Sequence, residues 1–97
     1  FETAVRANIP ILSILLNNSA MAVEFDSLPI SRKKYGSTDI SGNYAAFAKA
    51  MGGYGERIER AEDIIPAIRR GIAATEAGQP ALLEFITAQE TAKSVFS

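Results

Sequence analysis

The chain has 97 residues, of which 47% are hydrophobic and 22% charged, and its formal net charge is -1. This length fits one small domain, and this composition is that of a folded protein rather than a disordered tail. The absence of Cys and His excludes disulfides, thiolate metal sites and Ser-His-Asp catalysis within the chain, and the scattered basic residues indicate no face for nucleic acid.

The chain is predicted to open with the end of a helix, followed by a strand. Residues 1–6 begin without an initiator Met and read as the last turns of a helix, so we expect a fragment of a longer protein. Residues 9–16 form a short apolar run between polar residues, which predicts a strand buried on both faces in a parallel sheet. The run is too short to cross a membrane and no charged leader precedes it. We therefore expect a cytoplasmic protein without a membrane segment.

Residues 19–42 are predicted to form a long loop with at most one short helical turn. They lack apolar periodicity and contain Pro29, Gly36 and Gly42 among polar residues. Loops of this length are usually functional or disordered. The basic residues 32–34 could steer an anionic substrate, although a solvated loop is the interpretation we favour.

An amphipathic helix is predicted after this loop. In residues 43–51 the apolar side chains recur at i, i+3, i+4 and i+7. Asn43 fits the N-cap, and Gly52 with Gly53 fits the stop. Residues 54–58 are a weaker candidate for a strand.

A second helix is predicted at residues 61–77 and a further strand at residues 80–86. The helix carries one apolar stripe, formed by Ile64, Ile65, Ile68 and Ile72. Pro66 lacks an N–H and should delay or bend the first turns, and Gly78 should end the helix. Residues 87–97 are predicted to form a loose extension or a short helix.

The alternation of strands and helices predicts an α/β fold. We expect a three-layer α/β/α sandwich with a parallel sheet and right-handed crossovers. Three strands make a narrow sheet with two open edges, so further strands are expected upstream in the longer protein.

The first predicted strand is followed directly by Asn17, Asn18, Ser19 and Ala20. Ligands of open parallel sheets bind beyond the carboxyl ends of the strands, which makes these residues the leading site candidates. The side-chain oxygen of Asn suits a hard cation such as Mg²⁺, and the turn can direct backbone carbonyl groups at the same ion. A polar turn without a ligand is the alternative.

The Asn-Asn pair belongs to a longer pattern. Residues 2–6 and 9–11 precede it, and residues 44–53, 64–68 and 80–86 follow. Together these segments resemble the carboxyl-terminal part of the thiamine-diphosphate-binding domain of acetolactate synthases and of benzoylformate and pyruvate decarboxylases. In that family the signature runs from Gly-Asp-Gly, through a helix and a strand, to Asn-Asn. The resemblance implies that residues 1–97 are the carboxyl-terminal portion of such a domain.

The resemblance also implies a metal and cofactor site. Asn18 would give a side-chain oxygen to Mg²⁺, and Ala20 would give its backbone carbonyl oxygen. Ser19 would place a hydroxyl or N–H near a phosphate. The third protein ligand of the family is the Asp of Gly-Asp-Gly, which would precede residue 1.

Two further residues are candidates through the resemblance. Met21 would face the thiazolium ring of the cofactor, and core filling is its alternative role. Glu24 matches an active-site carboxylate of the pyruvate decarboxylase branch that takes part in proton transfer to the product. A solvated loop carboxylate is the alternative for Glu24, and we favour it.

The function implied by the resemblance is that of an enzyme acting on 2-oxo acids with thiamine diphosphate and Mg²⁺. Its reaction would be decarboxylation or acetolactate-synthase-like carboligation, as a lyase or a transferase. The rest of its own chain and a second subunit, in a homodimer or tetramer, would complete the site, so the fragment alone is expected to be inactive. The alternatives are a non-catalytic α/β domain used for assembly or regulation, and a flavodoxin-like interaction module.

Overall fold

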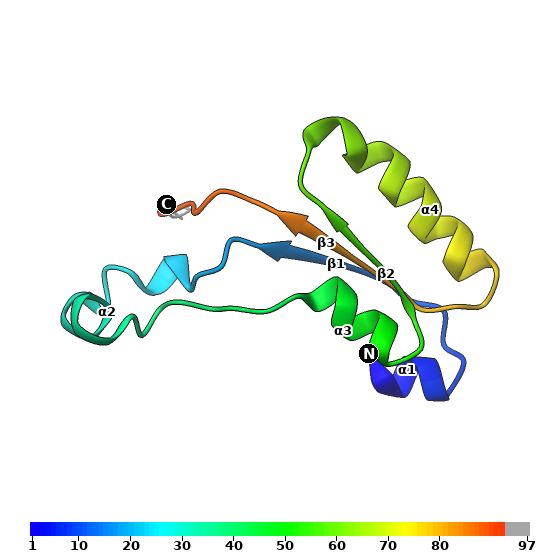
Figure 1. Cartoon of the computed structure of the whole chain (residues 1–97), viewed down its shortest axis with the longest axis horizontal. Helices are drawn as coiled ribbons and strands as arrows, with labels where there is room; N and C mark the ends of the chain where they lie inside the picture. Colours follow the sequence, from blue (N-terminus) through cyan, green and yellow to red (C-terminus); the bar gives the residue numbers. More distant parts are fainter. Residues whose placement is uncertain (93–97) are drawn as a thin grey trace, which may run out of the picture. The chain divides into compact units, whose positions relative to one another are not determined.

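The computed structural model describes residues 1–92 and divides the chain into two compact units. The first unit comprises Phe1–Asn17 and Asn43–Ile86, and the second comprises Asn18–Gly42 with residues 87–92. The first unit contains α1 (Glu2–Arg6), β1 (Leu12–Asn17), α3 (Tyr44–Ala50), β2 (Tyr54–Ile58), the 3-10 turn η2 (Ala61–Asp63), α4 (Ile64–Glu76) and β3 (Ala81–Ile86) (Figure 1).

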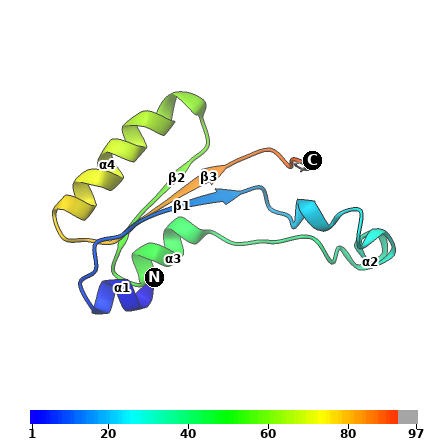
Figure 2. The same ribbon diagram turned by 180° about the vertical axis from the view of Figure 1, so that it is seen from behind.

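The three strands form one parallel sheet in the order β1-β3-β2. Helix α4 covers one face of the sheet and α3 the other, as both ribbon views show (Figures 1 and 2). The expected α/β/α arrangement with a parallel sheet is therefore confirmed. β3 lies between the other two strands and is the only one of the three that is buried along almost its whole length.

The prediction that the first strand is buried on both faces is wrong. β1 begins at Leu12 rather than at residue 9, and Ile14 and Leu16 are 49% and 70% exposed. β1 pairs only with β3, so within the described residues it is an edge strand. Pro10 precedes it, where a missing N–H costs no ladder hydrogen bond. The apolar run predicted the strand itself but not the exposure of these two side chains.

Helix α4 approaches the sheet through its small residues. Ala67 is fully buried in a core with Ile58, Leu83 and Phe85. A Cβ atom on Gly71 would lie 2.9 Å from Leu12 Cδ1, which shows how close the helix lies to the strands.

The predicted isoleucine stripe of α4 is thus only partly the buried face. Ile68 packs against the core, whereas Ile65 is 61% exposed. The buried face is centred on the small residues because the helix backbone, and not its larger side chains, sits closest to the sheet. Pro66 lies in the first turn of α4, after the 3-10 turn η2, and this confirms the expected delay of the helix.

Helix α3 packs equally closely on the opposite face. Ala45 and Ala48 are its buried residues, and a Cβ atom on Gly55 of β2 would overlap the Ala45 carbonyl oxygen. The Asn43 side chain accepts a hydrogen bond from the Ala46 N–H at 3.0 Å. This confirms the predicted N-cap.

The second unit is more ordered than the predicted loop. It contains the 3-10 turn η1 (Ala22–Glu24), which fits the short helical turn expected there, and helix α2 (Pro29–Tyr35), which was not predicted. Pro29 occupies the first turn, and Gly36 ends the helix with φ 61°. No residue of α2 is buried, so the apolar periodicity that reveals most helices is absent.

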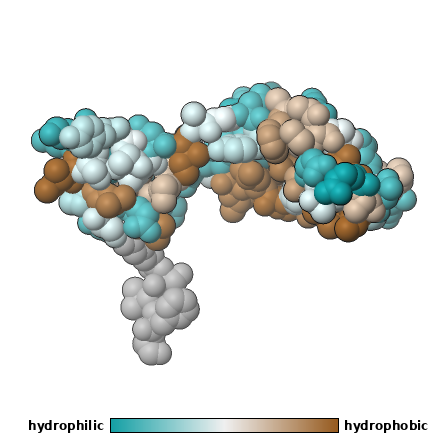
Figure 3. All heavy atoms as spheres, turned by 90° about the horizontal axis from the view of Figure 1, so that it is seen from below, coloured by the Kyte–Doolittle hydropathy of each residue, from teal (hydrophilic) through white to brown (hydrophobic). Residues whose placement is uncertain are grey.

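Side-chain contacts hold α2 to its own unit. The Arg32 guanidinium lies 3.6 Å from the centre of the Phe25 ring, and Phe25 is buried. Apolar side chains also remain on the surface of both units (Figure 3).

The segment after β3 carries no helix or strand over residues 87–92, in agreement with a loose extension. The rest of the predicted tail lies outside the described residues. No helix in the described part of the chain is long and apolar enough to cross a membrane.

Candidate functional site

The four predicted site residues Asn18 to Met21 lie together in one turn that follows β1. Asn18 Oδ1 accepts a hydrogen bond from the Ala20 N–H at 3.1 Å. Asn18 is thereby folded back over the turn, as Asn side chains do in Asx turns. Its amide oxygen keeps a second lone pair for another partner.

The backbone of this turn is paired with the segment that follows α2. Ala20 forms an antiparallel bridge with Asp39. The Met21 N–H donates to the Thr38 carbonyl oxygen at 2.7 Å, and the Ile40 N–H donates to the Ser19 carbonyl oxygen at 3.0 Å.

This pairing fixes the direction of the Ala20 peptide groups. The two hydrogen bonds come from the residues on either side of Ala20, so its own N–H and carbonyl group point to the opposite edge. The hydrogen bond between its N–H and Asn18 Oδ1 lies on that edge. The side-chain oxygen of Asn18 and the carbonyl oxygen of Ala20 are therefore presented on the same side of the turn.

Ser19, which lies between Asn18 and Ala20 in the sequence, adopts a strained backbone conformation. Its φ is 59°, in the left-handed region where a residue with a side chain costs about 1–2 kcal/mol. Strain of this kind gathers at ligand-binding turns, where the surrounding structure holds it in place. The bond to Ile40 is part of that support.

Two residues that sequence reasoning missed also belong to this region. Thr38 is fully buried, and its hydroxyl oxygen has no hydrogen-bond partner among the described residues. Gln89 Nε2 donates to the Asn18 carbonyl oxygen at 3.3 Å. Neither residue belongs to a recognisable motif. Each is distant from the turn in the sequence and comes close to it only when the chain folds.

The other two candidates sit just after the turn. The Met21 side chain is 44% exposed, so it does not fill a core. Glu24 is half-buried in η1, where its N–H donates to the Met21 carbonyl oxygen at 3.0 Å.

The chemistry of the turn suits a hard cation. Among the described residues no three His, Cys, Asp or Glu side chains are grouped so that they could hold a metal ion. The oxygen donors at the turn are instead one amide and one backbone carbonyl group. Such neutral oxygen atoms bind Mg²⁺ or Ca²⁺ and are poor ligands for softer metals. The residues present therefore suit a hard cation such as Mg²⁺ or Ca²⁺.

The carboxyl end of β1 is held by a buried charged group in the first unit. Glu84 of β3 is fully buried, and its Oε2 accepts a hydrogen bond from Asn17 Nδ2 at 2.6 Å. Its Oε1 accepts the Ala45 N–H of α3 at 3.1 Å, and Arg57 Nη1 of β2 lies 3.6 Å from Oε2. A charged residue in an apolar strand was the only sequence signal of this cluster.

A second polar cluster lies on the α4 face of the sheet. Glu56 accepts hydrogen bonds from Arg70 and from the Tyr54 hydroxyl, the latter at 2.7 Å. The hydrogen bond with Arg70 lowers the pKa of Glu56 and raises the pKa of Arg70. Burial and the hydrogen bond to Glu56 raise the pKa of Tyr54. The cluster links α4 to β2 and contains none of the predicted site residues.

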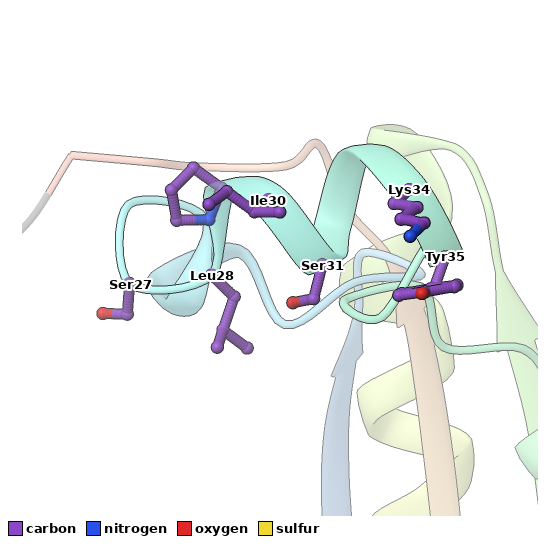
Figure 4. A pocket seen from close by; sticks show the side chains of 7 residues that line it. Ser27, Leu28, Ile30, Ser31, Lys34 and Tyr35 are labelled. Carbon is purple, nitrogen blue, oxygen red and sulfur yellow. The ribbon is translucent and has the colours of Figure 1, made fainter.

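A pocket of about 380 Å³ is formed by residues around α2 (Figure 4). Its lining comprises Ser27, Leu28, Pro29, Ile30, Ser31, Lys34 and Tyr35. None of the candidate site residues contributes to it, so it is separate from the turn described above.

The amino-acid sequence matches the family described as thiamine pyrophosphate enzyme, C-terminal TPP binding domain, over residues 1–85. The chain belongs to this family. The matched residues include the turn after β1, both helices that cover the sheet and all of β3 except its last residue. The cofactor of this thiamine-pyrophosphate-binding domain is thus thiamine diphosphate, and its α/β fold with a parallel sheet agrees with that assignment.

Proposed function

We propose that this domain holds the diphosphate of thiamine diphosphate through Mg²⁺ at the turn of Asn18, Ser19 and Ala20. The observation that carries this proposal is the common direction of the Asn18 side-chain oxygen and the Ala20 carbonyl oxygen. Ser19 supplies a hydroxyl group between them that suits a phosphate oxygen. The strained φ of Ser19 supports the proposal, because strain of this kind gathers at ligand-binding turns.

The turn supplies only part of the coordination shell. Mg²⁺ takes six oxygen ligands in a near-ideal octahedron, and Asn18 and Ala20 provide two. Diphosphate oxygens, water and other parts of the protein provide the rest. We propose that a second subunit, in a homodimer or tetramer, completes the cofactor site.

The proposed reaction is decarboxylation or carboligation of a 2-oxo acid in the cytoplasm, catalysed as a lyase or a transferase. Bound thiamine diphosphate supplies the carbon nucleophile and electron sink that such a reaction requires. The residues of this chain would bind and orient the cofactor: the turn would hold its charged tail, and Met21, whose side chain is exposed, would contact its ring. Glu24 is the candidate for holding a proton at its carboxylate near the product.

Replacement of Asn18 tests the metal role in the complete protein. Asn18→Ala removes one oxygen ligand and should weaken thiamine diphosphate binding at least about 10-fold at low Mg²⁺, with partial recovery at high Mg²⁺. Asn18→Asp keeps both the acceptor for the Ala20 N–H and an oxygen ligand, so it should retain magnesium-dependent binding. Isothermal titration calorimetry over a series of Mg²⁺ concentrations measures both effects.

A matched control makes the same truncation elsewhere. Asn43→Ala removes the N-cap of α3 and should cost about 1 kcal/mol of stability without changing cofactor affinity. If Asn18→Ala leaves the affinity unchanged, or if both variants lower it equally, the turn is not the metal site.

A further inference from the structure

Glu84 is the charged residue of an otherwise apolar central strand. It is fully buried, and in the sheet it lies between Leu15 of β1 and Arg57 of β2. A carboxylate is almost never buried completely unless it is paired and hydrogen-bonded, because removing it from water is costly. The desolvation cost of Glu84 must be offset by the groups that bind its carboxylate.

Its two oxygen atoms are used by three different elements. Oε2 binds the Asn17 amide at the end of β1 and faces Arg57 of β2, while Oε1 binds the Ala45 N–H in the first turn of α3. Removal of the carboxylate would leave the buried Ala45 N–H without this acceptor. Glu84 therefore ties both outer strands of the described sheet and one helix to β3.

The bond to Asn17 matters most for the site. Asn17 is the last residue of β1 and immediately precedes Asn18, the proposed magnesium ligand. Within the described residues β1 pairs with β3, and the ladder between them ends at Asn17 and Ile86. The 2.6 Å bond to Glu84 adds a side-chain anchor at this last residue of the ladder.

We propose that Glu84 is a positioning residue of the magnesium site, acting through Asn17 to fix the point from which the metal-binding turn departs. This inference rests on the proposed function of that turn. Glu84 does not touch the metal or the cofactor. It limits the freedom of the residue before Asn18, and such supporting contacts affect metal affinity by about 10- to 100-fold in other sites.

An exchange of hydrogen-bond polarity tests the proposal in the complete protein. Glu84→Gln keeps the size of the side chain but leaves a single acceptor. When its oxygen meets the Ala45 N–H, its N–H₂ group faces the Asn17 amide and the Arg57 guanidinium, where Oε2 now accepts. Combining it with Asn17→Asp restores the bond with donor and acceptor exchanged. The single variant should bind thiamine diphosphate and Mg²⁺ about 10-fold more weakly, and the combined variant should recover most of the loss.

Glu56→Gln is the matched control. It makes the same chemical change on the opposite face of the sheet, where Glu56 binds Arg70 and Tyr54, and it should leave the cofactor affinity unchanged. Calorimetric affinities are compared with the urea unfolding of each cofactor-free variant. A loss of affinity that follows the loss of stability in all variants would overturn the positioning role.

The outcomes separate this proposal from the proposed function. If Asn18→Ala weakens binding but Glu84→Gln does not, the positioning role is wrong and the metal site stands. If Asn18→Ala has no effect, the metal site itself is wrong. Should Glu84→Gln fail to fold, Asn17→Ser leaves the bonds of Glu84 to Ala45 and Arg57 in place, and unchanged affinity in that variant also overturns the proposal.

Discussion

Glu56 shows how a single side chain couples stability to pH in this domain. Its carboxylate is hydrogen-bonded to Arg70 and Tyr54, and Arg70 lowers its pKa below the ordinary value of 4.5. The folded state therefore favours the charged form more than the unfolded state does. The resulting stabilisation is fully present above pH 4.5 and is lost as the pH falls through the lowered pKa.

The first prediction at the residue scale follows from that sign. The destabilisation caused by Glu56→Gln should be largest near pH 7 and should shrink as the pH falls below 4.5, because protonation then removes the same charge from the wild-type protein. The effect should be modest, since the Arg70 side chain is half exposed. Urea unfolding of both proteins between pH 3 and 7 measures it, and a difference independent of pH would contradict the role of the ion pair.

At the scale of elements, each of the two helices that cover the sheet packs against it at a glycine residue. Gly55 of β2 lies against the backbone of α3, and Gly71 of α4 lies against the side chains of Leu12 and Leu83. A side chain can move to another rotamer, whereas a backbone carbonyl group within a helix cannot yield without moving the helix. The two glycines should therefore differ in their tolerance of a methyl group.

Alanine at each position tests that difference. Gly55→Ala places its Cβ against the Ala45 carbonyl oxygen and should destabilise the protein by about 1–3 kcal/mol or more. Gly71→Ala gains up to about 1 kcal/mol of helix propensity, which offsets its milder crowding. Chemical denaturation gives both free energies of unfolding. An equal or greater loss in Gly71→Ala would show that the α3 interface is the more adaptable one.

At the scale of the whole molecule, the two compact units differ in how many of their side chains are buried. The sheet unit has a buried core on α4 and a buried polar cluster at Glu84, whereas α2 in the other unit buries none of its residues. Segments with little burial open most readily. Cofactor and metal bound at the turn of residues 18–20 would add contacts to the second unit.

Amide exchange should reveal this difference. Residues 22–41 should exchange rapidly in the cofactor-free protein and slow markedly when thiamine diphosphate and Mg²⁺ are bound, while Ile64–Glu76 stays protected in both states. Hydrogen exchange followed by mass spectrometry measures both segments at once. Strong protection of residues 22–41 without cofactor would show a rigid element instead of one that is ordered by binding.

Much of the architecture was predictable from neighbouring residues. The alternation of apolar runs and helical periodicity predicted the three strands and the helices α3 and α4, and Asn43 was identified as the N-cap. The pattern around Asn18 also predicted the turn with its candidate ligands, and the family match supports thiamine diphosphate. Caps, turns and periodicity depend on residues within a few positions of one another, so the sequence by itself determined them.

The tertiary structure decided what depends on distant residues. Within the described residues it placed β3 between β1 and β2, and it left Leu16 exposed although this residue belongs to an apolar run. It formed α2 without an apolar stripe, brought Thr38 against the turn, and gave Glu84 partners 67 and 39 residues away. Strand order and the burial of charge are settled by which segments meet in the folded chain, and no local pattern carries that information.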